Sequence, residues 1–219
     1  MASIQKISKR YGLILGFVAL VCTALSTLVY FATESTINAV IEENQKELLA
    51  QVIPHSYYNN DLLANCYKTQ NNFIEGSNIR KICIAKKDQQ ITAYAFETIS
   101  PEGYSGEIRL LVGLTPAGEV LGVRTIEQHE TPGLGDKIEL KFSKWILSFN
   151  NKFLRPDNLK DWAVKKDGGQ FDQFTGATIT PRGVVKQVKI ASLALLKTLK
   201  TENLEQRLLK LKDQGNTHG

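Results

Sequence analysis

The sequence is poor in the residues and motifs that build metal centres, nucleotide loops and hydrolase sites. It has three cysteines and three histidines in 219 residues, and none are spaced like the ligands of a zinc or haem site. Its glycines form neither a G-x-G-x-x-G nor a G-x-x-x-x-G-K-[ST] loop, and there is no G-x-S-x-G elbow. The sequence therefore predicts no metal site, no dinucleotide fingerprint and no serine hydrolase.

The positive charge of the chain is small and partly confined to one end. The formal net charge is +5, and three of the positive charges lie in the first ten residues, which leaves +2 for the remainder. No basic motif or RNA-binding signature is present. We therefore expect no nucleic-acid partner.

A long apolar stretch follows the basic N-terminus. Residues 11–31, YGLILGFVALVCTALSTLVYF, contain no charged residue, and a helix of this length spans roughly 30 Å, the thickness of a bilayer core. A cleaved signal peptide is the alternative, but its apolar region is usually shorter. Lys6, Lys9 and Arg10 precede the stretch and Glu34 follows it. The positive-inside rule therefore predicts a single-pass protein with a cytoplasmic N-terminus. In a bacterium this would be an inner-membrane protein with a periplasmic domain.

Two of the three cysteines lie beyond this stretch. Cys22 is within it and is expected to act as a small apolar residue. Cys66 and Cys83 would lie in an oxidising compartment, where they could form a disulfide. Two unpaired buried thiols are the alternative, because sequence spacing does not give the distance between them.

The rest of the chain combines strand and helix patterns. Apolar residues at helical spacing predict a stalk helix that ends at Pro54. A short helix is expected near 141–149 and a long one from Arg182 to about Lys212. Four segments with strand-like composition are joined by turn-like sequences: 81–86, 91–99, 107–114 and 119–126.

This mixture predicts an α+β fold, with a small antiparallel sheet and helices packed on it. The expected division is a cytoplasmic tail (1–10), a transmembrane helix (11–31), a stalk helix and connecting region (32–78), one domain (79–212) and a C-terminal tail (213–219).

The segment DQFTGATITP, residues 172–181, places three threonines and little side-chain bulk before the long helix. Thr180 is expected to be the N-cap and Pro181 the first helical residue. The unpaired N–H groups of such a helix start would favour an anion. A cap and turn without any ligand is the alternative.

The same segment also resembles a known motif. Asp172–Thr178, DQFTGAT, is similar to the Dxx(S/T)GAT flavinylation motif of FMN-binding domains. GYSG at 103–106, HETPGLGDKIE at 129–139 and KKDGGQFDQFTGATITPRGVV at 165–185 match further landmarks of that family. With the N-terminal anchor, nearly the whole chain resembles the G subunits of the Rnf (Rsx) ion-translocating electron transport complexes. The C subunit of the sodium-translocating NADH:quinone reductase is a sister family.

The resemblance implies a cofactor and a set of site residues. In that family a flavin transferase links FMN through its phosphate to the last threonine of the motif, which here is Thr178, and recognition by the transferase involves the position of Asp172. The other cofactor-binding residues that we expect are Thr175, Gly176, Ala177, Glu130, Thr131, Leu134, Tyr104, Ser105 and Lys166.

The implied function is electron transfer. The resemblance predicts a subunit that passes electrons through covalent FMN within a translocase complex, has the other Rnf/Rsx subunits as partners, and has no independent catalytic site. The alternative is a membrane-tethered assembly or sensing module without flavin.

Overall fold

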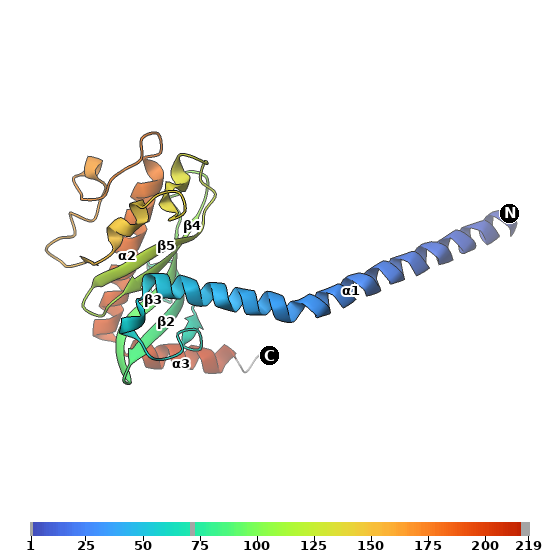
Figure 1. Ribbon diagram of the computed structural model, residues 1–219, viewed down its shortest axis with the longest axis horizontal. Helices are drawn as coiled ribbons and strands as arrows, with labels where there is room; N and C mark the ends of the chain where they lie inside the picture. The colour runs from blue at the N-terminus through green and yellow to red at the C-terminus, as the bar shows by residue number, and fades with distance from the viewer. Residues whose placement is uncertain (1, 71–72, 216–219) are drawn as a thin grey trace. The chain divides into compact units, whose positions relative to one another are not determined.

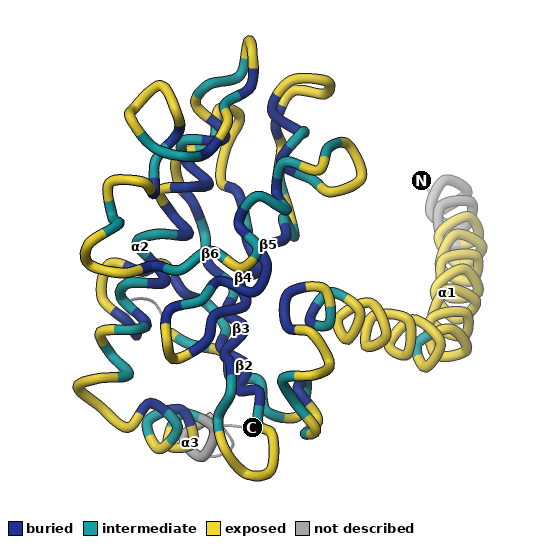
Figure 2. The backbone as a smooth tube through the Cα atoms, turned by 60° about the vertical axis from the view of Figure 1, so that its left-hand side comes forward, coloured by how far each residue is buried: buried dark blue, intermediate teal, exposed yellow. Residues whose placement is uncertain are grey.

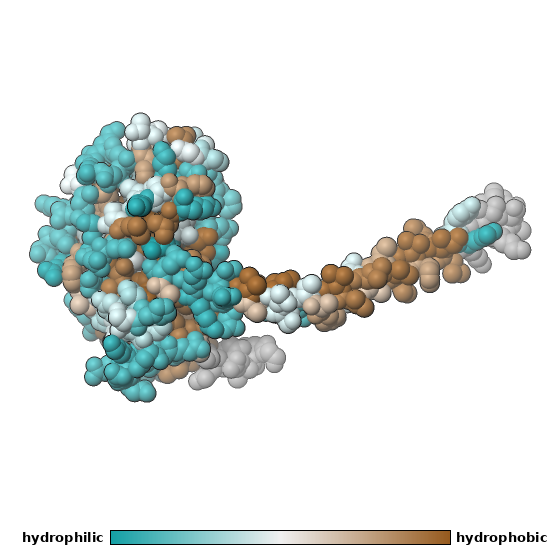
Figure 3. Space-filling model, in the orientation of Figure 1, coloured by the Kyte–Doolittle hydropathy of each residue, from teal (hydrophilic) through white to brown (hydrophobic). Residues whose placement is uncertain are grey.

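The computed structural model describes residues 2–70 and 73–215. These form two compact units, the first reaching to Gln45 and the second beginning at Lys46. Helix α1, Ala2–Val52, supplies the whole first unit. From Arg10 onward it is long and apolar enough to cross a membrane. Apolar side chains between residues 11 and 31 are exposed, and Figure 3 shows this stretch as largely hydrophobic surface. A hydrophobic surface of this extent fits the expected membrane anchor.

The second unit is built on one antiparallel sheet, in which the strands neighbour one another in chain order. The strands are β1 Cys66–Lys68, β2 Ile79–Lys87, β3 Gln90–Ser100, β4 Ile108–Leu114, β5 Glu119–Glu127 and β6 Lys152–Phe153. Asp88 and Gln89, both with positive φ, make the tight turn between β2 and β3. The four predicted strands correspond to β2–β5, which confirms the α+β fold.

Helices complete the unit. They are α2 Ile179–Thr201, α3 Leu204–Gly215 and four 3₁₀ turns: η1 His55–Tyr57, η2 Gly135–Ile138, η3 Trp145–Phe149 and η4 Lys165–Asp167 (Figure 1). Helix α3 includes part of the tail expected over 213–219, and residues 216–219 lie outside the described part of the chain.

The expectation of one uninterrupted helix from Arg182 to about Lys212 is wrong. Glu202 is extended, with φ −140° and ψ 154°, and ends α2. The side-chain oxygen of Asn203 then accepts the N–H of Gln206 at 3.2 Å, which is the bond of an N-cap residue at the start of α3. A second helix therefore begins where the first one ends.

Figure 2 shows the largely buried strands of the sheet between α2 and the end of α1. The two faces of the sheet differ in side-chain size. One face buries large side chains such as Ile84, Phe96 and Val112 against α2. The other face carries mostly small residues, Cys83, Ala85, Ala93 and Ala95, together with Gly113 and Gly122. This alternation follows from the period of two of a strand, which sends successive side chains to opposite faces.

The end of α1 packs on the small-residue face. Leu49, Val52 and Ile53 are at most 4% exposed. A Cβ atom added to Gly113 would lie 2.1 Å from the carbonyl oxygen of Val52, so only glycine permits this approach. The compact unit therefore begins at Lys46 instead of at residue 79, the boundary expected from sequence, because the last turns of α1 and strand β1 belong to its core.

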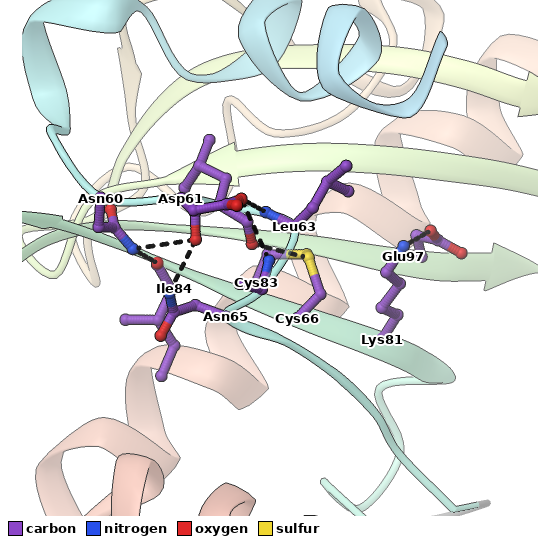
Figure 4. Close-up of a disulfide and its surroundings, with 11 residues drawn as sticks. Asn60, Asp61, Leu63, Asn65, Cys66, Lys81, Cys83, Ile84 and Glu97 are labelled. Carbon is purple, nitrogen blue, oxygen red and sulfur yellow. Dashed lines mark hydrogen bonds and ion pairs between the residues drawn. A yellow bond between two sulfur atoms is a disulfide. The ribbon is translucent and has the colours of Figure 1, made fainter. Parts of the chain in front are cut away.

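Cys66 and Cys83 face each other across β1 and β2 and are joined by a disulfide (Figure 4). The chain before β1 is held to β2 by polar contacts as well. The side-chain amide of Asn60 donates to the carbonyl of Ile84 at 3.0 Å, and its oxygen accepts the N–H of Lys86 at 2.8 Å. The edge of the sheet is thus fixed covalently and by hydrogen bonds.

Candidate functional site

Three segments that are distant in sequence enclose a cavity of about 370 Å³. They are the loop after β3 that contains GYSG, the loop after β5 that contains ETPGLG, and the segment TGATIT that leads into α2. They lie near the upper end of the sheet in Figure 1. The volume is in the range of small-ligand sites. The cavity is lined by Tyr104, Glu130, Thr131, Leu134, Gly135, Gly176, Ala177, Thr178, Ile179 and Thr180.

The start of α2 differs from the prediction. Thr180 was expected to be the N-cap, but the helix begins at Ile179 and Thr178 occupies the cap position, without a side-chain capping bond. Thr180 is fully buried, and its hydroxyl donates to Oε2 of Glu130 at 2.5 Å. Pro181 is the third helical residue and is tolerated there, because the first N–H groups of a helix have no intrahelical acceptor in any case.

The three threonines of the motif therefore have different environments. Thr175 is exposed and does not line the cavity, and Thr180 is engaged by Glu130. Thr178 lines the cavity, is half-buried, and its hydroxyl makes no hydrogen bond within the described residues. Of the three, Thr178 alone combines a free hydroxyl with a place in the cavity wall.

The first turn of α2 supplies positive potential to the cavity. Ile179 and Thr180 both line it, and their backbone N–H groups have no acceptor among the described residues. Such groups at a helix N-terminus favour an anion. A phosphate next to Thr178 would meet these donors.

The rim of the cavity is apolar and partly open. Tyr104 is 69% exposed, Leu134 40% and Ile179 46%. Gly176 has φ +82°, and a Cβ added there would lie 3.3 Å from Leu134, so a side chain at this position would crowd the rim. Exposed apolar side chains around a cavity suit a flat hydrophobic ring.

Glu130 connects all three segments. It is 6% exposed, and its Oε1 accepts the backbone N–H of Ser105 at 3.2 Å while its Oε2 accepts the Thr180 hydroxyl. Ser105 thus contributes through its backbone, and its side chain does not line the cavity.

Two other expected residues lie outside the cavity lining. Lys166 is exposed in the turn η4, and Asp172 is exposed and forms an ion pair with Lys165 at 2.5 Å. The backbone carbonyl of Asp172 accepts the indole N–H of Trp145 at 2.7 Å. The carboxylate of Asp172 is therefore displayed on the surface, where another protein can reach it.

A second contact holds the turn η4 to α2. The guanidinium of Arg182 donates to both carboxylate oxygens of Asp167, at 2.6 and 2.8 Å. This hydrogen bonding lowers the pKa of Asp167 below its usual value. The chain just before the motif is therefore tied to the first turns of α2.

Three lining residues were not predicted from the sequence: Gly135, Ile179 and Thr180, the last of which was expected only as an N-cap. Each lies within two residues of a predicted one, since Gly135 follows Leu134, and Ile179 and Thr180 are the next two residues after Thr178. A wider window around both motifs would have included them.

Comparison with known proteins gives consistent matches over the chain. The FMN-binding domain family matches residues 103–192, and the RnfG N-terminal region family matches residues 1–52. A solved structure, the crystal structure of Shewanella oneidensis NqrC, is 21% identical, with a TM-score of 0.45 over 69% of this chain and 73% of that chain.

Curated relatives match at high identity over most of their length. The G subunit of the ion-translocating oxidoreductase complex of Haemophilus influenzae (strain 86-028NP) is 60% identical over 191 residues, 87% of this chain and 91% of the relative. That of Pasteurella multocida (strain Pm70) is 56% identical over 198 residues, 90% and 98% of the two chains. That of Yersinia pestis is 48% identical over 190 residues, 87% and 91%.

Proposed function

Because the chain belongs to the family of G subunits of ion-translocating oxidoreductase complexes, we propose that it relays electrons within such a complex through an FMN bound covalently to Thr178. The observation that carries this proposal is the placement of Thr178, whose free hydroxyl lines the cavity at the N-terminal end of α2. The two matching families agree with the resemblance seen in the sequence, and the match to the FMN-binding domain supports FMN as the cofactor.

The residues of the cavity fit the parts of an FMN. A phosphoester on Thr178 would keep one negative charge beside the free N–H groups of Ile179 and Thr180. Gly176 and Ala177 leave room for the ring, and Tyr104 and Leu134 supply apolar walls. The flavin supplies the redox chemistry when bound, while the protein supplies binding, orientation and electrostatics.

Thr178 is an attachment point in this proposal, and the subunit has no catalytic site of its own. A flavin transferase acts during maturation and recognises the motif with the help of the exposed Asp172. Covalent attachment keeps the flavin with the protein in a compartment where a released cofactor would be diluted.

The membrane arrangement is part of the proposal. The apolar part of α1 anchors the protein in a bacterial inner membrane, and the basic residues before it leave the N-terminus in the cytoplasm. The domain then lies in the periplasm, and the disulfide between Cys66 and Cys83 suits an oxidising compartment. Protease added to spheroplasts should digest the domain. A domain that is protected in spheroplasts but digested in lysed cells would indicate the opposite orientation.

Co-expression with a flavin transferase tests the covalent link. The wild-type chain should fluoresce as a flavoprotein in a denaturing gel, and its mass should increase by that of FMN less one water. Thr178→Ala should abolish both signals, because no hydroxyl remains at that position of the cavity wall.

Thr178→Ser and Thr201→Ala are the matched controls. The serine keeps a hydroxyl at the same position and should retain flavin. Thr201 is exposed and lies outside both the motif and the cavity lining, so its loss should leave the modification intact. A wild-type chain that stays colourless and unmodified would instead favour a tethered assembly or sensing module.

A further inference from the structure

The buried carboxylate of Glu130 is the one acidic group in the wall of the cavity, as far as the described residues form it. Its two oxygens bond to residues of two other segments, Ser105 in the loop after β3 and Thr180 in α2. The backbone of Glu130 is fixed as well, since its N–H donates to the side-chain oxygen of Gln128. Gln128 is in turn held by Glu139, to which its amide donates at 2.7 Å.

Two glycines make room for this carboxylate. A Cβ added to Gly103 would lie 2.8 Å from Oε1 of Glu130, and one added to Gly135 would lie 2.6 Å from Oε2. Distances below 3 Å do not occur between a real Cβ and its neighbours without a shift. A side chain at either glycine would therefore displace the carboxylate, and at Gly103 it would also meet the carbonyl oxygen of Gly106 at 2.0 Å.

Within residues 2–70 and 73–215, the charge of Glu130 has no lysine or arginine partner. None of the ion pairs in this part of the chain includes it. What stabilises the carboxylate is its two hydrogen bonds and the positive end of α2. A negative charge without a counter-ion, in a site of low solvent exposure, acts strongly on any redox group bound beside it.

We propose that Glu130 is a positioning residue that joins the three walls of the cavity, and that its charge lowers the reduction potential of the flavin held there. Reduction adds negative charge to the ring system, and a fixed carboxylate in the same wall opposes it. The inference rests on the proposed function, because it needs a flavin in this cavity.

Reductive titration of the flavin-loaded, full-length protein in detergent tests the electrostatic part. Glu130→Gln keeps the shape of the side chain and can hydrogen-bond both Ser105 and Thr180, but it removes the charge. The reduction potential should rise by at least about 30 mV, which for a two-electron couple is a tenfold change in the equilibrium constant of reduction.

Two variants separate charge from structure. Glu127→Gln removes the same charge from an exposed position outside the cavity lining, where Glu127 pairs with Arg109, and it should leave the potential unchanged. Thr180→Val breaks one bond of Glu130 but keeps its charge, so the potential should stay the same or fall. A Glu130→Gln protein with the wild-type potential would overturn the electrostatic part.

The positioning part is tested without the flavin. In protein made without transferase, Glu130→Ala leaves the N–H of Ser105 and the buried hydroxyl of Thr180 without their acceptor. It should lower the melting temperature by about 5 °C, whereas Glu130→Gln should lose much less. Equal melting of the wild type and both variants would overturn this part. If the wild-type chain carries no flavin after co-expression with the transferase, the proposed function is rejected instead. The melting comparison of flavin-free proteins would still test whether Glu130 joins the walls of the cavity.

Discussion

One face of the sheet packs against α2 through large side chains. The other face packs against the end of α1 through a close approach of the two backbones. Against α2 the sheet presents Phe96 and its neighbours, and this core continues into the aromatic cluster of Phe149, Trp162 and Phe171. Against the end of α1 it presents alanines and glycines, and the two backbones nearly touch. Packing against α2 depends on large buried side chains, and packing against α1 depends on small ones. Stability should therefore fall when a residue is made smaller on the first face and when one is made larger on the second.

The largest effect is expected from removing volume on the α2 side. Phe149 is fully buried and stacks on Phe171 with ring centroids 4.4 Å apart. Phe149→Ala should lower the free energy of unfolding by about 3–5 kcal/mol, because it leaves a cavity in a close-packed core. Thermal or urea unfolding of the full-length protein in detergent measures this, and Phe149→Leu should lose clearly less. A loss below about 1 kcal/mol would show that this side is loosely packed.

A smaller effect is expected from adding volume on the α1 side. Gly113→Ala would place a methyl group 2.1 Å from the carbonyl oxygen of Val52, whereas Gly122→Ala would place one 2.9 Å from the Cα of Val52. The first change should cost about 1–3 kcal/mol and the second less.

Whether the two alanine variants lose or gain stability shows how closely α1 approaches the sheet. An alanine that fits its site stabilises a protein relative to glycine, because it restricts the unfolded chain. Unfolding measurements in which both alanine variants are as stable as the wild type would mean that the end of α1 does not need this close approach. Protease susceptibility of the segment around Val52 gives an independent measure of the same contact.

The smallest effect is expected at alkaline pH. Tyr94 belongs to the large-residue face, and burial, together with the charge of Glu205, raises its pKa to about 12. Because this pKa lies above that of an unfolded tyrosine, the native protein binds more protons between about pH 10 and 12, and stability falls as the pH rises through that range. The loss should be about 1 kcal/mol at pH 11.

Tyr94→Phe should remove most of this alkaline loss. Tyr58, which packs beside the small-residue core, also has its pKa raised by burial and provides the comparison on the opposite side. If Tyr58→Phe flattened the pH profile more than Tyr94→Phe, the stronger burial assigned to the large-residue face would be contradicted.

Much of the fold was predictable because its signals are local. Strands β2–β5 were found from their composition and turns, and even the difference between the two faces is written in alternations such as Ala93-Tyr94-Ala95-Phe96. The break between α2 and α3 also has a local signal, the capping residue Asn203, which was overlooked.

The missed features depend on contacts that are distant in sequence. Thr180 has every local property of an N-cap, but its hydroxyl is taken by Glu130, fifty residues earlier in the chain. The start of the domain at Lys46 likewise depends on how Val52 meets Gly113. The motif around Thr178 identified the expected attachment point, whereas the division of roles among the three threonines required the tertiary structure.

The order of the strands bears on how the protein matures. Each strand from β2 to β5 pairs with the one synthesised just before it, so the sheet can grow by successive hairpins while the rest of the chain is still being made. The segment that carries Thr178 is made after all of these strands. Two walls of the cavity can therefore exist before the third arrives, and cofactor loading becomes a final step that only a nearly complete chain can undergo.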